Sequence, residues 1–235
     1  MNIIRLGLIL FFITVSMTIL QSQSEELDSS YMDEKARLLE FTFNINNPLG
    51  TLSNNIGQAL YGASGTLLMQ RDSERYSYYG IDFSYAHLGS LTNTITSNGF
   101  PEEDRTSTNY ISAQFVYRYY TTFHTTRIEP FIDVKLGPHL MYTATSITFL
   151  DGSGGTDFLF EETDFGLAYA VEAGANFNLG NSFFGTLKFG YTGGTATSYS
   201  VPADAILLEF PIDNFTKFTS AISFLTTKIG VAFSF

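Results

Sequence analysis

Few residues of this chain have the chemistry of a catalytic base or nucleophile, because it contains three histidines and no cysteine. A hydrolytic site needs a hydroxyl or thiol within hydrogen-bond reach of a base. His87 lies close before Ser90, and this is the one pair to consider for that role. We expect His124 to lie in a solvated turn and His139, beside Pro138, to form a hydrogen bond in the interior. The sequence therefore predicts no catalytic residue.

Metal and cofactor sites are equally weakly indicated. No group of His, Asp and Glu has the spacing of metal ligands, although Glu102, Glu103 and Asp104 could weakly attract a cation. The glycine-rich run DGSGGTD, Asp151 to Asp157, falls between two predicted strands and not between a strand and a helix. A phosphate-binding loop needs the second arrangement. We therefore expect a flexible surface loop there, and neither a cofactor nor a metal.

A larger group of charged residues occurs within apolar segments, at positions that share one face of a strand. Five are acids and four are bases, so a nearly neutral network of ion pairs is expected where they meet. The network is predicted to line the interior of the protein, and its members are Glu40, Asp82, Arg118, Glu129, Asp133, Lys135, Glu172, Lys188 and Lys228.

The elements that position these charges are strands, because apolar and polar residues alternate with a period of two. In RLLEFTFNI, residues 37–45, the side chains of Leu39, Phe41, Phe43 and Ile45 share one face. Aromatic residues make up 16% of the chain, which favours half-buried sheet surfaces. The full set of predicted strands is 37–45, 62–71, 76–87, 108–120, 128–145, 165–179, 183–193 and 219–235.

The beginning of the chain predicts export. Residues 1–24 read as a signal peptide, with Arg5 before an apolar stretch and small residues Ser22 and Ser24 at the cleavage site. Residues 25–37 are acidic and show no alternation, so they are expected to be a periplasmic segment before a barrel of residues 38–235. Beyond the leader, no apolar run approaches the ~20 residues of a membrane helix.

The lengths of the connections predict a topology. Short links at 72–75, 121–127 and 180–182 alternate with long ones at 47–61, 88–107, 146–164 and 194–218. Outer-membrane barrels have short periplasmic turns and longer extracellular loops. The pattern predicts an all-β, eight-stranded antiparallel up-and-down transmembrane β-barrel with periplasmic termini. Three phenylalanines are candidate contact residues in the long loops: Phe100, Phe158 and Phe160.

A soluble protein would use the same alternation differently. A soluble sandwich or a lipid-binding barrel of the cytosol would turn its apolar face inward and would have no leader. With the leader removed, 11 basic residues stand against 23 acidic ones, a balance of −12 that argues against nucleic acid as a partner.

The last eight residues, KIGVAFSF, resemble the C-terminal signal that the outer-membrane assembly machinery recognises. The matching residues are Lys228, Gly230, Phe233 and Phe235. The run Tyr117 to Gly137 also looks familiar, together with YTATSITF, FGLAYAVEAGANFNLG and FGYTGGTATSY. Over residues 38–235 the chain resembles uncharacterised outer-membrane β-barrel proteins of Bacteroidota, related in architecture to OmpA, OmpX and OmpW. The resemblance implies a fold and a location and brings no active site.

Three functions follow from these observations. The leading hypothesis is a non-enzymatic scaffold of the outer membrane that presents surface loops for binding, or an accessory subunit of an outer-membrane complex. Its expected partners are outer-membrane lipid, the assembly machinery during biogenesis and a possible complex partner. A narrow channel of the OmpW kind is the alternative, although an eight-stranded barrel is only just wide enough for its own side chains.

A lipid hydrolase of the outer membrane is the third hypothesis. His87 and Ser90 faintly resemble the His and Ser pair of the lipid A deacylase barrels. Their spacing does not match an H-x-S motif, and the adjacent asparagine of that family is absent.

Overall fold

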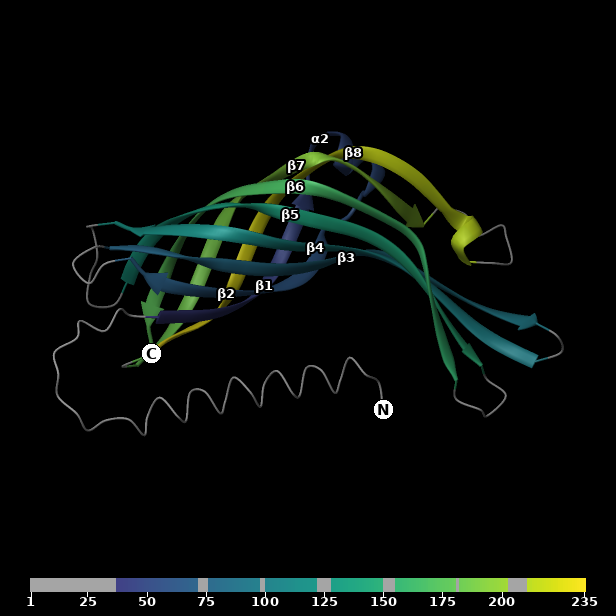
Figure 1. The fold of residues 1–235 in the computed structure, drawn as a ribbon, viewed down its shortest axis with the longest axis horizontal. Coiled ribbons are helices and arrows are strands. Elements are labelled where there is room, and N and C mark those ends of the chain that lie inside the picture. Colours follow the sequence, from purple (N-terminus) through teal and green to yellow (C-terminus); the bar gives the residue numbers. More distant parts are fainter. Residues whose placement is uncertain are drawn as a thin grey trace.

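The computed structural model describes residues 37–71, 76–97, 100–121, 128–149, 155–180, 182–202 and 211–235. The predicted leader and the segment before Arg37 lie outside these residues. The eight strands are all antiparallel and close into a barrel in sequence order, so the predicted all-β fold is confirmed (Figure 1). The elements are β1 Arg37–Pro48, α2 Gly50–Asn55, β2 Leu60–Gln70, β3 Ser77–Ser97, β4 Phe100–Tyr120, β5 Ile128–Phe149, β6 Thr156–Asn178, β7 Phe183–Pro202, η1 Pro211–Asn214 and β8 Phe215–Ser234.

The first and last strands close the barrel. β1 pairs with β8 from Leu38↔Ser234 to Pro48↔Phe224. At the end of this ladder, Arg37 and Phe235 exchange two backbone hydrogen bonds of 3.0 Å. The C-terminal strand that resembles the assembly signal is therefore the strand that completes the closed sheet.

Within the barrel, the strands for which faces were predicted show the expected alternation of outward apolar and inward polar side chains. Outward side chains such as Phe83 and Leu136 are each 60% exposed, whereas inward Glu40, Asp82 and Asp133 are fully buried. This is the reverse of a soluble barrel, in which the apolar face is buried. Among the described helical segments, none combines the length and the apolar character that crossing a membrane requires.

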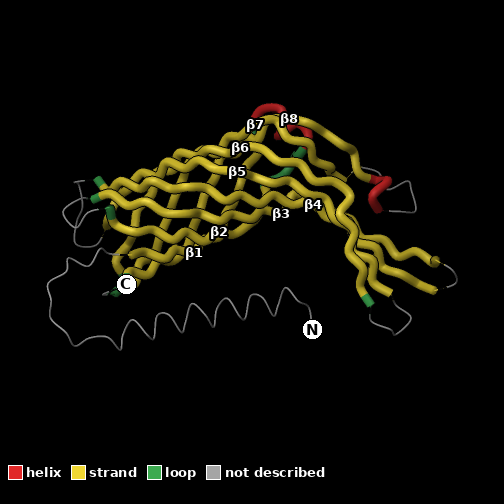
Figure 2. Tube along the Cα trace, viewed as in Figure 1, coloured by secondary structure: helices red, strands yellow, loops and turns green. Residues whose placement is uncertain are grey.

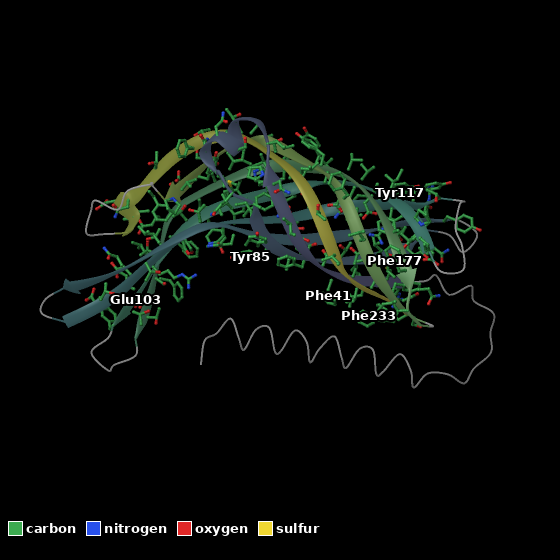
Figure 3. All side chains as sticks on the ribbon, turned by 180° about the vertical axis from the view of Figure 1, so that it is seen from behind. Phe41, Tyr85, Glu103, Tyr117, Phe177 and Phe233 are labelled. Atoms are coloured by element: carbon green, nitrogen blue, oxygen red, sulfur yellow. The ribbon has the colours of Figure 1, made fainter. Side chains whose placement is uncertain are left out.

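One end of the barrel carries the short connections, and we call it the turn end. Backbone bonds join Arg71 to Ser77, Thr121 to Pro130 and Leu179 to Phe183 there, beside the C-terminus (Figure 1). Figure 3 places Tyr117 and Phe177 near this end and Glu103 at the opposite one.

At the opposite end the strands run far beyond the barrel, which corrects three of the predicted loops. Residues 88–107, 146–164 and 194–218 were expected to be loops, but most of the described residues in them continue β3 to β8. In these extended parts, Thr, Ser and Asn occur on both faces of the strands. Apolar and polar residues therefore do not alternate regularly along the sequence there. Threonine nevertheless favours strands, and pairing with the neighbouring hairpin extends the ladder.

The extended parts of β3 to β6 form a four-stranded sheet, the protruding sheet, made of residues 88–97, 100–108, 141–149 and 156–167 (Figure 2). The extended parts of β7 and β8 with η1 form a separate arm. Ladder irregularities lie at His87/Gly89, Thr143/Ala144 and Gly193/Ala196, where these parts leave the barrel. Such bulges bend a strand and increase its twist, which is how the sheet and the arm diverge.

Glycines allow the tight curvature of the barrel wall. A Cβ at Gly80 would collide with the backbone carbonyl of Leu67 on the neighbouring strand, and one at Gly230 with that of Phe41. Both positions face inward, so only glycine lets the two backbones approach this closely.

Candidate functional site: the filled lumen and the open edge of β6

A charged cluster occupies the middle of the barrel. The guanidinium of Arg118 donates from Nε to Asp133 Oδ1 at 2.7 Å and from Nη2 to Asp133 Oδ2 at 2.8 Å. Nη2 also donates to Glu40 Oε2 at 2.9 Å. Lys188 pairs with the same two carboxylates, with Nζ 3.2 Å from Asp133 Oδ2. Two acids are thus each shared by two bases, and all four side chains are buried.

A second group of charges lies beside the first. Lys135 Nζ is 3.1 Å from Asp82 Oδ2 and 2.9 Å from Glu172 Oε2, and Lys228 Nζ is 2.9 Å from Glu172 Oε1. Thr66 of β2 donates to Asp82 Oδ2 at 2.7 Å. Every strand therefore contributes to the cluster.

Eight of the nine residues that were expected to form a charged network take part in these ion pairs. Glu129 lies nearer the turn end, half buried in the wall of a cavity. The eight comprise four acids and four bases, so the cluster is formally neutral. Because desolvation offsets much of the attraction between buried charges, the cluster is better regarded as a filler that requires all its members than as a source of large net stability.

An apolar layer closes the lumen on the side of the protruding sheet. Leu52 of helix α2 and Ile56, directly after the helix, pack against Tyr199, Phe224 and further side chains, all buried. Between this layer and the charges lies a cavity of about 20 Å³ lined mainly by polar residues. Helix α2 was not predicted, because six residues give too short a pattern for a helix to be recognised in the sequence.

Aromatic rings close the lumen toward the turn end. Arg118 stacks over Phe131, with 3.7 Å between the guanidinium carbon and the ring centroid. Tyr120 contacts both Phe131 and Tyr78 edge-on, at centroid distances of 5.5 and 5.4 Å. Beyond them is a larger cavity of about 310 Å³. The side chains that fill the lumen thus form an apolar layer, a charged layer and an aromatic layer in succession.

The histidines do not form a hydrolytic site among the described residues. His139 Nε2 lies 2.7 Å from Thr197 Oγ1 and is buried, as predicted for an interior hydrogen-bonding residue. His87 Nδ1 lies 3.0 Å from Asn109 Oδ1 on β4, a partner that the sequence did not reveal. Ser90 is exposed and paired in register with Ser107. His124 lies outside the described residues.

The three consecutive acids are in β4 and not in a loop. Alternation along the strand buries Asp104 and exposes Glu103, so the carboxylates of these neighbours point to opposite faces. The described part of the chain contains no group of three or more His, Cys, Asp or Glu side chains that could hold a metal. Most of the run DGSGGTD lies outside the described residues, and its last two residues begin β6.

The residues of the expected assembly signal lie on both faces of β8. Lys228 points into the charged cluster. Phe233 points outward, with its ring centroid 5.0 Å from that of Phe183 on β7. Figure 3 shows Phe233 close to Phe41 near the turn end. Phe235 is exposed and bonds through its backbone to Arg37. Recognition by the assembly machinery stays a prediction.

The edge strand of the protruding sheet is the most exposed segment of the described chain. The ladder between β6 and β7 begins only at Ala168↔Gly194. The arm still contacts Glu162, through Ser200 Oγ at 2.8 Å and through Lys217. Among the described residues, the part of β6 with no strand beside it on that side is therefore 156–161. Residues 155–161 are all exposed, and Phe158, Leu159 and Phe160 are 67%, 54% and 70% exposed. Phe158 and Phe160 had been expected in a loop and instead belong to this strand. Phe100 begins β4.

The alternation of backbone bonds shows which groups face the open side. Phe149 N donates to Gly155 O at 3.1 Å, which makes this pair a hydrogen-bonded pair of the β5–β6 ladder. Bonded and non-bonded pairs alternate in antiparallel sheets. The register therefore turns the backbone N–H and C=O of Phe158 and Phe160 away from β5, toward the open edge.

Comparison with known proteins gives a likeness of fold only. No family model matches the chain, and no curated protein matches it. Among solved structures it is similar to Neisserial surface protein A, at 11% identity and a TM-score of 0.41, over 86% of this chain and 97% of that one. It is also similar to OprG of Pseudomonas aeruginosa (14%, 0.42, 86% and 96%) and to outer membrane protein W of Escherichia coli (11%, 0.39, 86% and 98%). Identities this low transfer no role.

Proposed function

We propose that the chain is an integral protein of the outer membrane, anchored by its barrel. The exterior of the barrel supports this, because large apolar side chains such as Phe83, Leu136 and Ile229 are about 60% exposed on several strands. Soluble monomers rarely expose apolar patches beyond a few hundred Å². A closed sheet also pairs its backbone groups internally, as hydrocarbon requires.

The orientation follows from the connections and belongs to the same proposal. Short turns gather at the end where the barrel begins and ends, and in outer-membrane barrels this end faces the periplasm. The predicted leader agrees with export. The protruding sheet and the arm then lie outside the cell, so the turn-end cavity opens to the periplasm.

Within this location, we infer that the barrel is a closed, non-enzymatic scaffold that binds another protein along β6. The observation that carries this is the open edge at Phe158 and Phe160, whose backbone donors and acceptors face outward beside exposed aromatic rings. An exposed apolar edge strand is a template for pairing with another extended chain.

The acidic residues of β6 favour a partner that carries basic residues. Asp157 and Glu161 are exposed and flank Phe158–Phe160 on either side. Antiparallel pairing of two copies centred on Leu159 would set Asp157 opposite Glu161, and like charges directly opposite each other destabilise a sheet. An extended segment that combines apolar and basic residues is therefore favoured over a second copy of this chain.

Synthetic peptides test this proposal on the folded protein in lipid nanodiscs. We expect an eight-residue peptide of alternating Val and Lys to bind measurably better than one of alternating Val and Glu. Phe158→Pro should abolish the binding, because it removes an edge donor without removing a bond to β5. Phe158→Ala keeps that donor and should weaken binding only partly.

The control is Phe83→Ala on the barrel exterior, which should leave peptide binding unchanged. All variants are first checked for barrel folding by their mobility in unheated detergent gels. Equal binding of the two peptides, or undiminished binding to Phe158→Pro, would overturn the assignment of the edge.

A further inference from the structure

The cavity at the turn end has the dimensions and lining of a small-molecule site. We infer that it binds a small neutral aromatic compound that carries a hydroxyl group. Its volume of about 310 Å³ lies at the lower limit of ligand pockets. Residues from all eight strands or the turns beside them line it: Leu38, Gln70, Tyr76, Tyr78, Tyr120, Thr121, Glu129, Asn176, Phe184 and Ser234.

Aromatic rings make up most of the apolar part of this lining. Tyr76, Tyr78, Tyr120 and Phe184 line the cavity together with Leu38. Tyr78 meets Tyr120 edge-on, at a centroid distance of 5.4 Å. Aromatic rings in edge-to-face or offset contact attract each other beyond the effect of the area that they bury. A ligand ring therefore gains contacts here that a saturated ring of the same shape would not make.

A buried amide supplies the polar contact. Asn176 lines the cavity and is 1% exposed, and its amide nitrogen donates to the hydroxyl of Tyr120 at 2.8 Å. The other end of this amide, Oδ1, has no hydrogen-bond partner among the described residues. Leaving a buried acceptor without a donor is costly. We expect a ligand hydroxyl to donate to this oxygen after a small rotation of the amide toward the cavity.

The charges near the cavity favour a neutral ligand. Glu129 is the one charged residue of the described lining, and it already interacts with another part of the chain. Arg118 contacts Tyr120, but its charge is compensated by Asp133 and Glu40 at 2.7 and 2.9 Å. A charged ligand would lose its hydration without meeting a charge that is not already engaged, and such a loss is costly.

Probes of similar shape separate these contributions. p-Cresol has both the aromatic ring and the hydroxyl, 4-methylanisole lacks the O–H donor, and 4-methylcyclohexanol lacks the aromatic ring. 4-Methylbenzoate and 4-methylbenzylammonium carry a negative and a positive charge. Each is titrated into the protein in nanodiscs, and NMR follows the backbone amides of Thr121 and Ser234 in the cavity wall. Empty nanodiscs measure the uptake of each probe by lipid, and its free concentration is corrected accordingly.

We expect p-cresol to shift both amide resonances in a saturable manner. 4-Methylanisole should bind about fivefold more weakly, because it gives Asn176 Oδ1 no donor. 4-Methylcyclohexanol should bind about threefold more weakly, because it makes no contact between aromatic rings. The two charged probes should bind about tenfold more weakly than p-cresol, because their charges are desolvated without compensation.

Two variants locate the site. Asn176→Leu should weaken p-cresol about fivefold and change 4-methylanisole little, because only p-cresol donates to the amide. Phe184→Leu should weaken both aromatic probes and change 4-methylcyclohexanol little. Asn46→Leu, at the smaller cavity between the apolar layer and the charges, is the matched control and should leave all binding unchanged. Each variant is first checked for barrel folding by its mobility in unheated detergent gels.

Several results would overturn the inference. They are equal binding of p-cresol and 4-methylanisole, p-cresol binding that Asn176→Leu or Phe184→Leu leaves unchanged, tighter binding of either charged probe, and the absence of any saturable shift with p-cresol. The test is independent of the β6 edge.

Discussion

The protruding sheet continues four strands of the barrel, yet the inward faces of the two regions carry different kinds of polar residue. In the barrel, β4 and β5 point Arg118, Asp133 and Lys135 inward and apolar side chains outward. Beyond the bulges, the inward positions of these two strands carry threonines that bond across the ladder, such as Thr106 to Thr145 at 2.8 Å. The difference shows that surroundings, more than strand propensity, decide which residues each stretch of one strand can hold.

Removing the central base of the barrel should have the largest effect. Arg118→Leu would leave Asp133 and Glu40 with Lys188 as their remaining partner in the cluster, and breaking a buried ion pair costs about 3–5 kcal/mol. We expect a loss of this order in the free energy of unfolding, measured by urea titration in lipid vesicles. The matched change in the protruding sheet is Arg105→Leu, at an exposed position, which should cost less than about 0.5 kcal/mol. Similar losses for the two variants would contradict the proposed contrast.

A charge on the outer face should have the next largest effect. Val134→Arg places a cation on the exterior of β5, where the cost near the bilayer midplane is about 2–4 kcal/mol. Thr92→Arg in the protruding sheet should be nearly neutral. The same urea titration measures both. If the barrel exterior faces water, the two substitutions will cost the same, and the membrane location will be wrong.

The smallest expected effect is the loss, on acidification, of a contact between the protruding sheet and the arm. The backbone N–H of Ser198 donates to Asp164 Oδ2 at 2.7 Å and lowers the pKa of that carboxyl below its ordinary value of 3.8. A lowered pKa means that the contact stabilises the ionised form. Its contribution is therefore present above the ordinary pKa and is lost as the pH falls through the lowered one.

Hydrogen exchange measures this loss. We expect the protection factor of the Ser198 amide to fall when the pH is lowered below the ordinary carboxyl pKa of 3.8 and through the lowered pKa of Asp164. In Asp164→Asn the protection should be low at neutral pH and change little on acidification. Amides of the β1–β8 ladder serve as the reference and should stay protected. An unchanged Ser198 protection factor in acid would show that the carboxylate does not hold the arm.

The sequence predicted the barrel well and the protruding sheet poorly, for one physical reason. Alternation is visible where one face meets a strongly different environment from the other, as at Phe41 and Glu40. Beyond Leu88 on β3, apolar residues no longer recur at every second position, so the pattern disappears while the strand continues. The pairing of His87 with Asn109 could not be predicted either, because it depends on the register between two strands.

The sequence by itself determined that eight segments alternate, which face of each is apolar, and that buried acids and bases nearly balance. Only the tertiary structure decided which charges meet, where Glu129 lies relative to them, and how far the ladders extend. The reason is that alternation is a local property, fixed by residues two apart. Register, bulges and barrel closure join residues such as Glu40 and Arg118, which are distant in the chain, and they are fixed only when all strands pair together.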